Sequence, residues 1–117
     1  MDEISVPIMV MKKMCYEDQC KIMEMIGREY KASCVKANMK KLHGSIYDNQ
    51  RRYDNALEYI DYVDAALRMC DLNTRHIIMH EYLLPSDEKW YLVYYSKSTF
   101  YRLKRIALEE FLRCLDL

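Results

Sequence analysis

Apolar side chains recur at helical spacing through residues 46–70, which carry the most regular pattern in the chain. The stripe contains two seven-residue series offset by three positions: Tyr53, Ile60 and Leu67, and Ala56, Val63 and Cys70. Such spacing predicts one long helix with a single apolar face. The opposite face is acidic, with Asp54, Glu58, Asp61 and Asp64 opposed by Arg68. The stripe is either the spine of an intramolecular helical bundle or the seam of a homodimer through 46–70.

The segment before this helix predicts an arm and a first helix. Residues 1–10 are apolar and contain a proline, so we expect an irregular or short extended arm. A helix is expected from about residue 16 to Gly27 or beyond. The His43-Gly44-Ser45 sequence is a clear break, and Ser45 is a suitable N-cap for the long helix.

Capping residues and a proline divide the segment after the long helix. Asn73 is expected to cap a helix that ends near residue 83, because Pro85 disfavours helical backbone at the residue before it. A short helix at 88–93 and a last long helix at 97–115 then follow. Two helices joined by a tight turn at the end of the chain are typical of a helix-turn-helix.

Together these elements predict an all-α protein, a helical bundle with a long central helix and a C-terminal helix-turn-helix. We expect three regions: an N-terminal arm and helical region at 1–45, a long acidic helix at 46–72 and a helix-turn-helix DNA-binding region at 73–117. Two glycines and two prolines in 117 residues argue against an all-β sandwich or barrel, which needs many turn residues. Gly27 and Gly44 are too far apart for a glycine-rich phosphate loop.

Charge and cysteine content indicate the cellular compartment and the kinds of partner that we expect. The longest uncharged apolar run, residues 4–11, is far shorter than the roughly 20 residues of a membrane helix, so no membrane partner is expected. The 18 basic and 18 acidic residues cancel, which excludes a uniformly basic coat but not a basic patch. Five cysteines without a C-x-x-C pair, and an acidic start without a signal-peptide pattern, favour a reducing cytoplasm. Cys70 and Cys114 are expected to act as small hydrophobic residues.

The last helix has a basic surface. Residues 96–108 contain four basic side chains and no acid, and Ser96 is the expected N-cap. Phe100, Leu103 and Ala107 recur at the spacing of a core face, so the opposite side is free to contact DNA. The candidate DNA-binding residues are Lys97, Ser98, Thr99, Tyr101, Arg102, Lys104 and Arg105. We expect phosphate contacts from the two lysines and base-edge contacts from Ser98, Tyr101, Arg102 and Arg105.

Two motifs in the C-terminal half resemble a known family. The first is R-H-I-I-M-H-E-Y-L at 75–83, and the second is Y-S-K-S-T-F-Y-R-L-K-R-I-A-L at 95–108. With the acidic helix before them, they resemble the ArpU/RinA-type phage and prophage transcriptional regulators, which are themselves similar to region four of sigma factors. The resemblance covers about residues 59–115. It implies a helix-turn-helix regulator of transcription with duplex DNA as its partner and RNA polymerase as a second candidate partner.

Two positions depart from the pattern of that family. The turn usually carries a glycine two residues before the capping serine, where this chain has Tyr94. A small residue is usual about six positions before that serine, where the two helices touch, and this chain has Trp90. A residue other than glycine in a left-handed turn costs about 1 kcal/mol. We therefore expect a reshaped or lengthened turn.

Other candidate chemistry is weak. His76 and His80 share a helix face but lack the third ligand of a zinc site, and the paired carboxylates lie beside no predicted cleft. We expect no metal, no cofactor and no catalytic residue, and hence no enzyme. Sequence-directed DNA binding in transcriptional regulation is the favoured function. Two alternatives stay open, a sigma-region-four-like module that binds RNA polymerase and a helical interaction or oligomerisation protein that binds no DNA.

Overall fold

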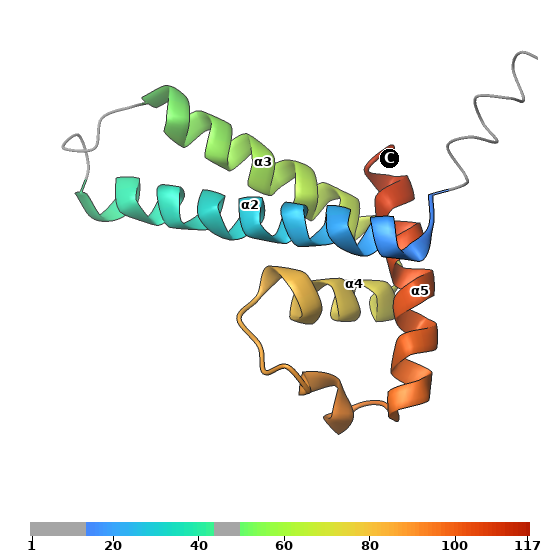
Figure 1. Ribbon diagram of the computed structural model, residues 1–117. Helices are drawn as coiled ribbons and strands as arrows, with labels where there is room; N and C mark the ends of the chain where they lie inside the picture. The colour runs from blue at the N-terminus through green and yellow to red at the C-terminus, as the bar shows by residue number, and fades with distance from the viewer. Residues whose placement is uncertain (1–13, 44–49) are drawn as a thin grey trace, which may run out of the picture.

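The computed structural model describes residues 14–43 and 50–117 (Figure 1). The regular elements in these residues are all helical: α2 (Tyr16–His43), α3 (Gln50–Arg68), α4 (Leu72–Ile78), the π-helical turn η2 (Met79–Leu83), the 3₁₀ helix η3 (Trp90–Val93) and α5 (Lys97–Cys114). The expected all-α helical bundle is confirmed. No helix in this part of the chain is long and apolar enough to cross a membrane. The expected N-terminal arm and the Ser45 cap lie outside the described residues.

α2 and α3 lie side by side, and α5 crosses them at the end where α2 begins and α3 finishes (Figure 1). α2 continues well past Gly27 and ends at His43, at the expected break. Met23 from α2 and Val63 from α3 are fully buried where the two helices meet. The Tyr30 hydroxyl also donates a hydrogen bond of 3.1 Å to the Asp64 carboxylate. The pair therefore forms one framework on which α5 rests.

Four of the six residues of the α3 stripe face the interior of the molecule, whereas Tyr53 and Ile60 are only half-buried. Ala56, Val63 and Leu67 are buried, and so is Cys70 just beyond the end of the helix. Side chains of α2 and α5 belong to the same core cluster as the last three of these residues. The stripe is thus the spine of an intramolecular bundle. The alternative of a homodimer seam through 46–70 is not supported, because such a seam would require the core to open.

The start of α4 differs from the prediction. The helix begins at Leu72, so Asp71 occupies the N-cap position and the expected cap, Asn73, lies inside the first turn. A carboxylate from α5 replaces the missing side-chain cap. Glu110 accepts a hydrogen bond of 3.1 Å from the Asp71 backbone N–H and one of 2.6 Å from the Thr74 hydroxyl. A distant residue therefore supplies the capping interaction and joins α4 to α5.

The helix that starts with α4 ends where it was expected to end, but through a π-helical turn. The Leu84 backbone N–H donates to the carbonyl of Met79 over 2.8 Å, and Leu84 itself is extended, as the following Pro85 requires. The next helix is shorter than predicted. The short helix expected over 88–93 is the single 3₁₀ turn η3, which begins at Trp90.

α5 carries the core of the C-terminal unit on one face. Phe100, Ala107, Leu108 and Phe111 are each at most 1% exposed. Past the end of the helix, the Leu115 carbonyl accepts a hydrogen bond of 2.7 Å from the Tyr62 hydroxyl of α3. The C-terminal half of α5 is thus fastened to the framework, which leaves its N-terminal half to project beyond it.

Gly27 marks the closest approach of α2 to the C-terminal unit. A Cβ atom at this position would lie 2.5 Å from the backbone carbonyl oxygen of Tyr82 in η2. Replacing a helical glycine by alanine ordinarily stabilises a helix by about 1 kcal/mol. Here the added methyl group meets backbone, which cannot rotate away as a flexible side chain can. The contact therefore outweighs the helix propensity.

We expect Gly27→Ala to lower the free energy of unfolding by roughly 1–3 kcal/mol, the usual cost of overpacking. Asn38→Ala, at an exposed position of the same helix, is the matched control and should leave stability unchanged or slightly higher. Urea unfolding followed by circular dichroism measures both. A more stable Gly27→Ala protein would show that α2 and η2 do not touch in this way.

Candidate nucleic-acid interface

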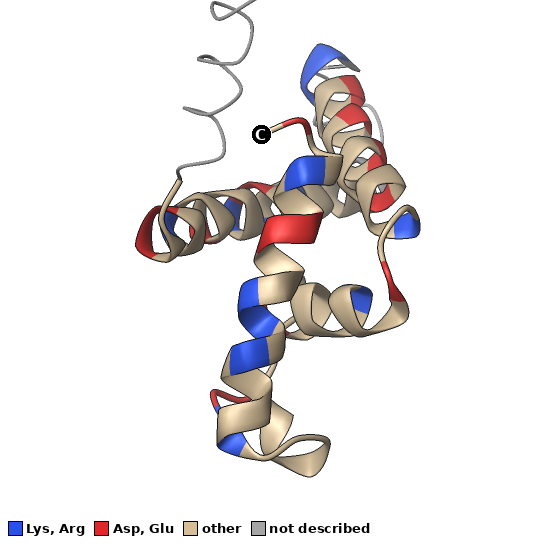
Figure 2. Cartoon of the chain, turned by 90° about the vertical axis from the view of Figure 1, so that its right-hand side faces the viewer, with Lys and Arg blue, Asp and Glu red and all other residues tan. Residues whose placement is uncertain are grey.

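The C-terminal unit has the arrangement of a helix-turn-helix. α4 with η2 forms the first helix, η3 lies across a loop from it, and α5 follows η3 after a tight turn (Figure 1). The N-terminal half of α5 belongs to this unit and extends away from α2 and α3 (Figure 2). Phe100 stacks on Tyr91 of η3 with ring centroids 4.0 Å apart and planes at 5°. Aromatic packing therefore fixes α5 against the short helix that precedes it.

The turn before α5 needs no left-handed residue. Tyr94, which stands where the related pattern has glycine, has φ −109° and ψ −29°. The backbone N–H groups of Tyr94 and Tyr95 both donate to the Tyr91 carbonyl, over 2.9 and 2.8 Å. The turn continues the 3₁₀ helix, which any residue can adopt. The turn therefore accommodates Tyr94 without the left-handed backbone that favours glycine.

Ser96 caps α5 as expected. Its side-chain oxygen accepts from the Thr99 backbone N–H over 3.3 Å, which satisfies one of the free donors of the first turn. The Ser96 hydroxyl also donates to the Thr99 hydroxyl over 2.9 Å. Thr99 is half-buried and takes part in the cap, so it holds the turn in shape rather than standing free on the surface.

Trp90 occupies the place where a small residue was expected, and its ring joins the helices. It stacks on His80 at 5.1 Å, and its edge-to-face contacts to His76 and Phe100 are at 5.3 and 5.6 Å. The indole N–H donates to the Glu81 carboxylate over 2.8 Å. A buried indole is stable when its N–H has such a partner. The indole ring therefore fills the space between the helices.

Lys104 does not lie on the exposed face of α5. It is 9% exposed, and its ammonium group forms an ion pair of 2.9 Å with the second oxygen of Glu81. The physical reason is helical phase, because Lys104 lies four residues after Phe100 and three before Ala107, on the core face. The expectation that Lys104 neutralises a phosphate is therefore corrected. The sequence analysis did not identify the contact between Glu81 and Trp90, which adjoins this ion pair.

Four of the predicted residues share an exposed face. Lys97, Ser98, Tyr101 and Arg102 lie in the first two turns of α5 and are solvent-accessible, with Tyr101 43% exposed. Figure 2 shows basic positions along the projecting half of α5, while acidic positions follow one side of α3. The exposed end of α5 and the acidic side of α3 thus carry opposite charge. The projecting end of α5 is a part of the molecule that can approach a polyanion.

Arg105 is exposed but engaged with α2. Its guanidinium group lies over the ring of Tyr16, 4.1 Å from the ring centroid, in a cation–π contact. Tyr16 opens α2, and the acidic residues Glu17 and Asp18 follow it in the first turn. This negative turn adjoins the middle of α5. It limits the free basic face to the residues before Arg105.

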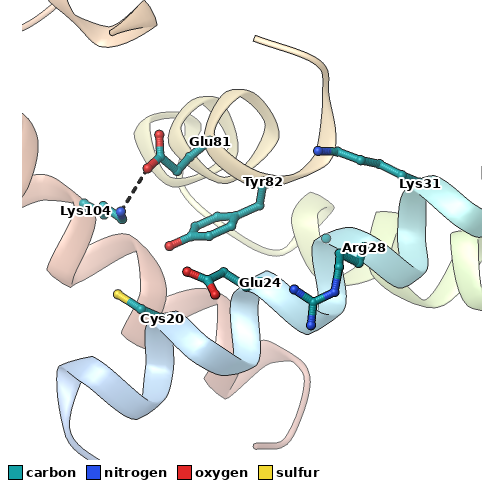
Figure 3. A pocket seen from close by; sticks show the side chains of 8 residues that line it. Cys20, Glu24, Arg28, Lys31, Glu81, Tyr82 and Lys104 are labelled. Atoms are coloured by element: carbon teal, nitrogen blue, oxygen red, sulfur yellow. Dashed lines mark hydrogen bonds and ion pairs between the residues drawn. The ribbon is translucent and has the colours of Figure 1, made fainter. Parts of the chain in front are cut away.

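An open pocket of about 370 Å³ lies between α2, η2 and α5 (Figure 3). Glu24 and Arg28 of α2 line it beside Tyr82, and the Lys104–Glu81 ion pair closes one side. Acidic and basic groups alternate around it, so the lining does not select one charge of ligand. No group of three His, Cys, Asp or Glu side chains among residues 14–43 and 50–117 is placed to hold a metal ion.

Comparisons of the chain with protein-family models, with curated proteins and with solved structures give no match. The resemblance to phage regulators therefore rests on the two motifs quoted above. The contacts within the molecule define the site, and the resemblance suggests only its biological setting.

The Glu81 ion pair provides a test of how the C-terminal unit is held. The two side chains are 23% and 11% exposed, so removing one charge leaves the other largely desolvated. We expect Glu81→Gln to lower the free energy of unfolding by roughly 2–4 kcal/mol, somewhat below the range for fully buried pairs. Adding Lys104→Met should recover much of this loss, because no uncompensated charge remains.

The matched control for this pair is Glu109→Gln. Glu109 pairs with Arg113 at 3.7 Å, but both side chains are 70% exposed, and such pairs contribute less than about 1 kcal/mol. Urea unfolding compares the four proteins. Equal losses for the two glutamate variants would mean that the Glu81 pair is no better shielded than a surface pair.

His76 makes stability depend on pH. Burial, and then the neighbouring His80, lower the pKa of His76 from its ordinary value of 6.5. The unfolded state therefore binds a proton more readily, so the contribution of His76 is complete above pH 6.5 and is lost as the pH falls through the lower folded pKa. We expect the melting temperature to decrease as the pH is lowered from about 7.5 to 5.5. The melting temperature of the His76→Gln variant should decrease less over the same range. Identical slopes would exclude His76 as the cause.

Proposed function

We propose that the chain binds duplex DNA in a sequence-directed way, through the N-terminal half of α5, and so regulates transcription. The observation that carries this proposal is the projecting, acid-free end of α5, held by the packing of η3 and capped by Ser96. A helix presented in this way fits the major groove, where its first turns meet base edges. The exposed residues of the second motif, Lys97, Ser98, Tyr101 and Arg102, lie on this same surface.

The exposed residues have different proposed roles. Lys97, at the first helical position, is suited to a phosphate, because a lysine is a point charge on a flexible stem. Ser98, Tyr101 and Arg102 lie on the side that would face the bases, and arginine pairs two-fold with guanine. Arg105 adds positive charge nearby, while its stacking on Tyr16 restricts its reach.

The setting in a phage or prophage is proposed from the resemblance of the motifs alone. The acidic side of α3 would be repelled by DNA, which favours one orientation of the protein and leaves that side for a partner such as RNA polymerase. A sigma-region-four-like module that needs polymerase is the second candidate. The stripe of α3 weighs against an oligomerisation protein, since four of the six residues that would form its seam are buried within the chain.

The salt dependence of DNA binding tests the proposal. Two or three free basic side chains imply a log–log slope of about −2 to −3, at roughly −0.9 per phosphate contact. With Lys104 also free, the slope would be steeper. Fluorescence anisotropy with a duplex selected from a random pool measures it. No binding at about 50 mM salt, with or without RNA polymerase, would contradict DNA binding.

Two substitutions distinguish a residue that contacts phosphate from one that recognises a base. Arg102→Ala should cost roughly 1–3 kcal/mol on the selected site and relax the preference at one base pair. Lys97→Ala should weaken binding to all sequences alike. Arg113→Ala is the matched control, because Arg113 is exposed on α5 but at the other end and paired with Glu109. Equal losses from Arg102→Ala and Lys97→Ala across a panel of duplexes would remove the assigned roles.

A further inference from the structure

Two of the five cysteines meet in space although they are 44 residues apart in sequence. Cys70 lies in the turn after α3, and Cys114 is the last residue of α5. Their sulfur atoms are 3.7 Å apart, with the Cys70 thiol donating toward Cys114. The other three cysteines, Cys15, Cys20 and Cys34, belong to α2 and the residue just before it. The pair therefore joins two elements that the fold brings together.

The two thiols of this pair differ in access. Cys70 is 3% exposed, and burial, followed by its hydrogen bond to Cys114, raises its pKa to about 12. Its thiol is thus shielded from reagents in solution. Cys114 is only partly buried, so its thiol is the more accessible of the two. One sulfur is placed to react first and the other to resolve the product.

We propose that Cys70 and Cys114 are a reversible modification site and form an intrachain disulfide when the protein meets hydrogen peroxide. The Cys114 thiolate attacks one peroxide oxygen, the O–O bond breaks, and a sulfenic acid and hydroxide form. The Cys70 sulfur then attacks the Cys114 sulfur, the S–S bond forms and the S–O bond breaks. The departing hydroxide takes the Cys70 proton as water. Two thiols are oxidised and the peroxide is reduced to two waters.

The disulfide would close a loop that contains the whole helix-turn-helix. Residues 71–113 lie between the two cysteines and include α4, η2, η3 and nearly all of α5. Linking the ends of such a long loop restricts the unfolded chain and so raises stability. The bond lies about 18 Å along α5 from Arg102, at 1.5 Å per residue. The inference is independent of DNA binding and holds whether or not the proposed function does.

Peroxide treatment of the full-length protein tests the inference. We expect that alkylation followed by non-reducing peptide mass spectrometry finds residues 70 and 114 linked within one chain, with three thiols still free. The melting temperature should rise on oxidation and return after reduction by dithiothreitol. Pairing of other cysteines, links between chains, or sulfinic acid at Cys114 with Cys70 still free would overturn the proposal.

Single substitutions assign the order of the steps. Cys114→Ser should give no link and leave Cys70 unmodified by peroxide. Cys70→Ser should accumulate a sulfenic acid at Cys114 that dimedone traps, and Cys34→Ser is the matched control that should form the disulfide normally. Circular dichroism checks that each variant is folded. If Cys70→Ser does not fold, peroxide oxidation of Cys70 in Cys114→Ser would still contradict the assigned order.

Discussion

The carboxylate of Glu81 is the interaction on which the C-terminal unit depends. One oxygen accepts the indole N–H of Trp90 at 2.8 Å, and the other holds the ammonium group of Lys104 at 2.9 Å. These contacts join η2, η3 and α5 at a single point. A mostly buried lysine needs such a partner, because an uncompensated charge out of water is costly. The position of α5, and with it the exposed basic end, follows from this contact.

Helical phase, the position of a residue around the helix axis, explains which predictions from the sequence are correct and why the one for Lys104 is wrong. The stripe of α3, the proline that ends η2 and the serine that caps α5 act within one or two helical turns, so they can be recognised locally. Lys104 was assigned by charge, although its spacing from Phe100 and Ala107 places it on the core face. The spacing carried the correct information. Charge alone does not decide exposure when an acid on another element is available.

Other features depend on contacts that no local pattern specifies. Glu110 caps α4 from a separate helix, and Tyr16 stacks on Arg105 across most of the chain length. The π-helical turn at 79–83 adds a residue to one turn of helix, which changes the directions of the side chains after it. Trp90 lies between helices at a position where the pattern of the phage regulators has a small residue. These arrangements require the folded framework of α2 and α3.

The same framework limits how much of α5 can contact a ligand. One face of its C-terminal half lies in the core, and the acidic first turn of α2 adjoins its middle. On α5, the exposed basic side chains without a partner among the described residues lie in its first two turns, because Arg105 stacks on Tyr16 and Arg113 pairs with Glu109. If the chain binds DNA as proposed, so few phosphate contacts would give weak non-specific attraction. Tight binding would then have to come from base contacts by residues such as Arg102 or from a partner on the acidic side of α3, in contrast to strongly basic DNA-binding domains.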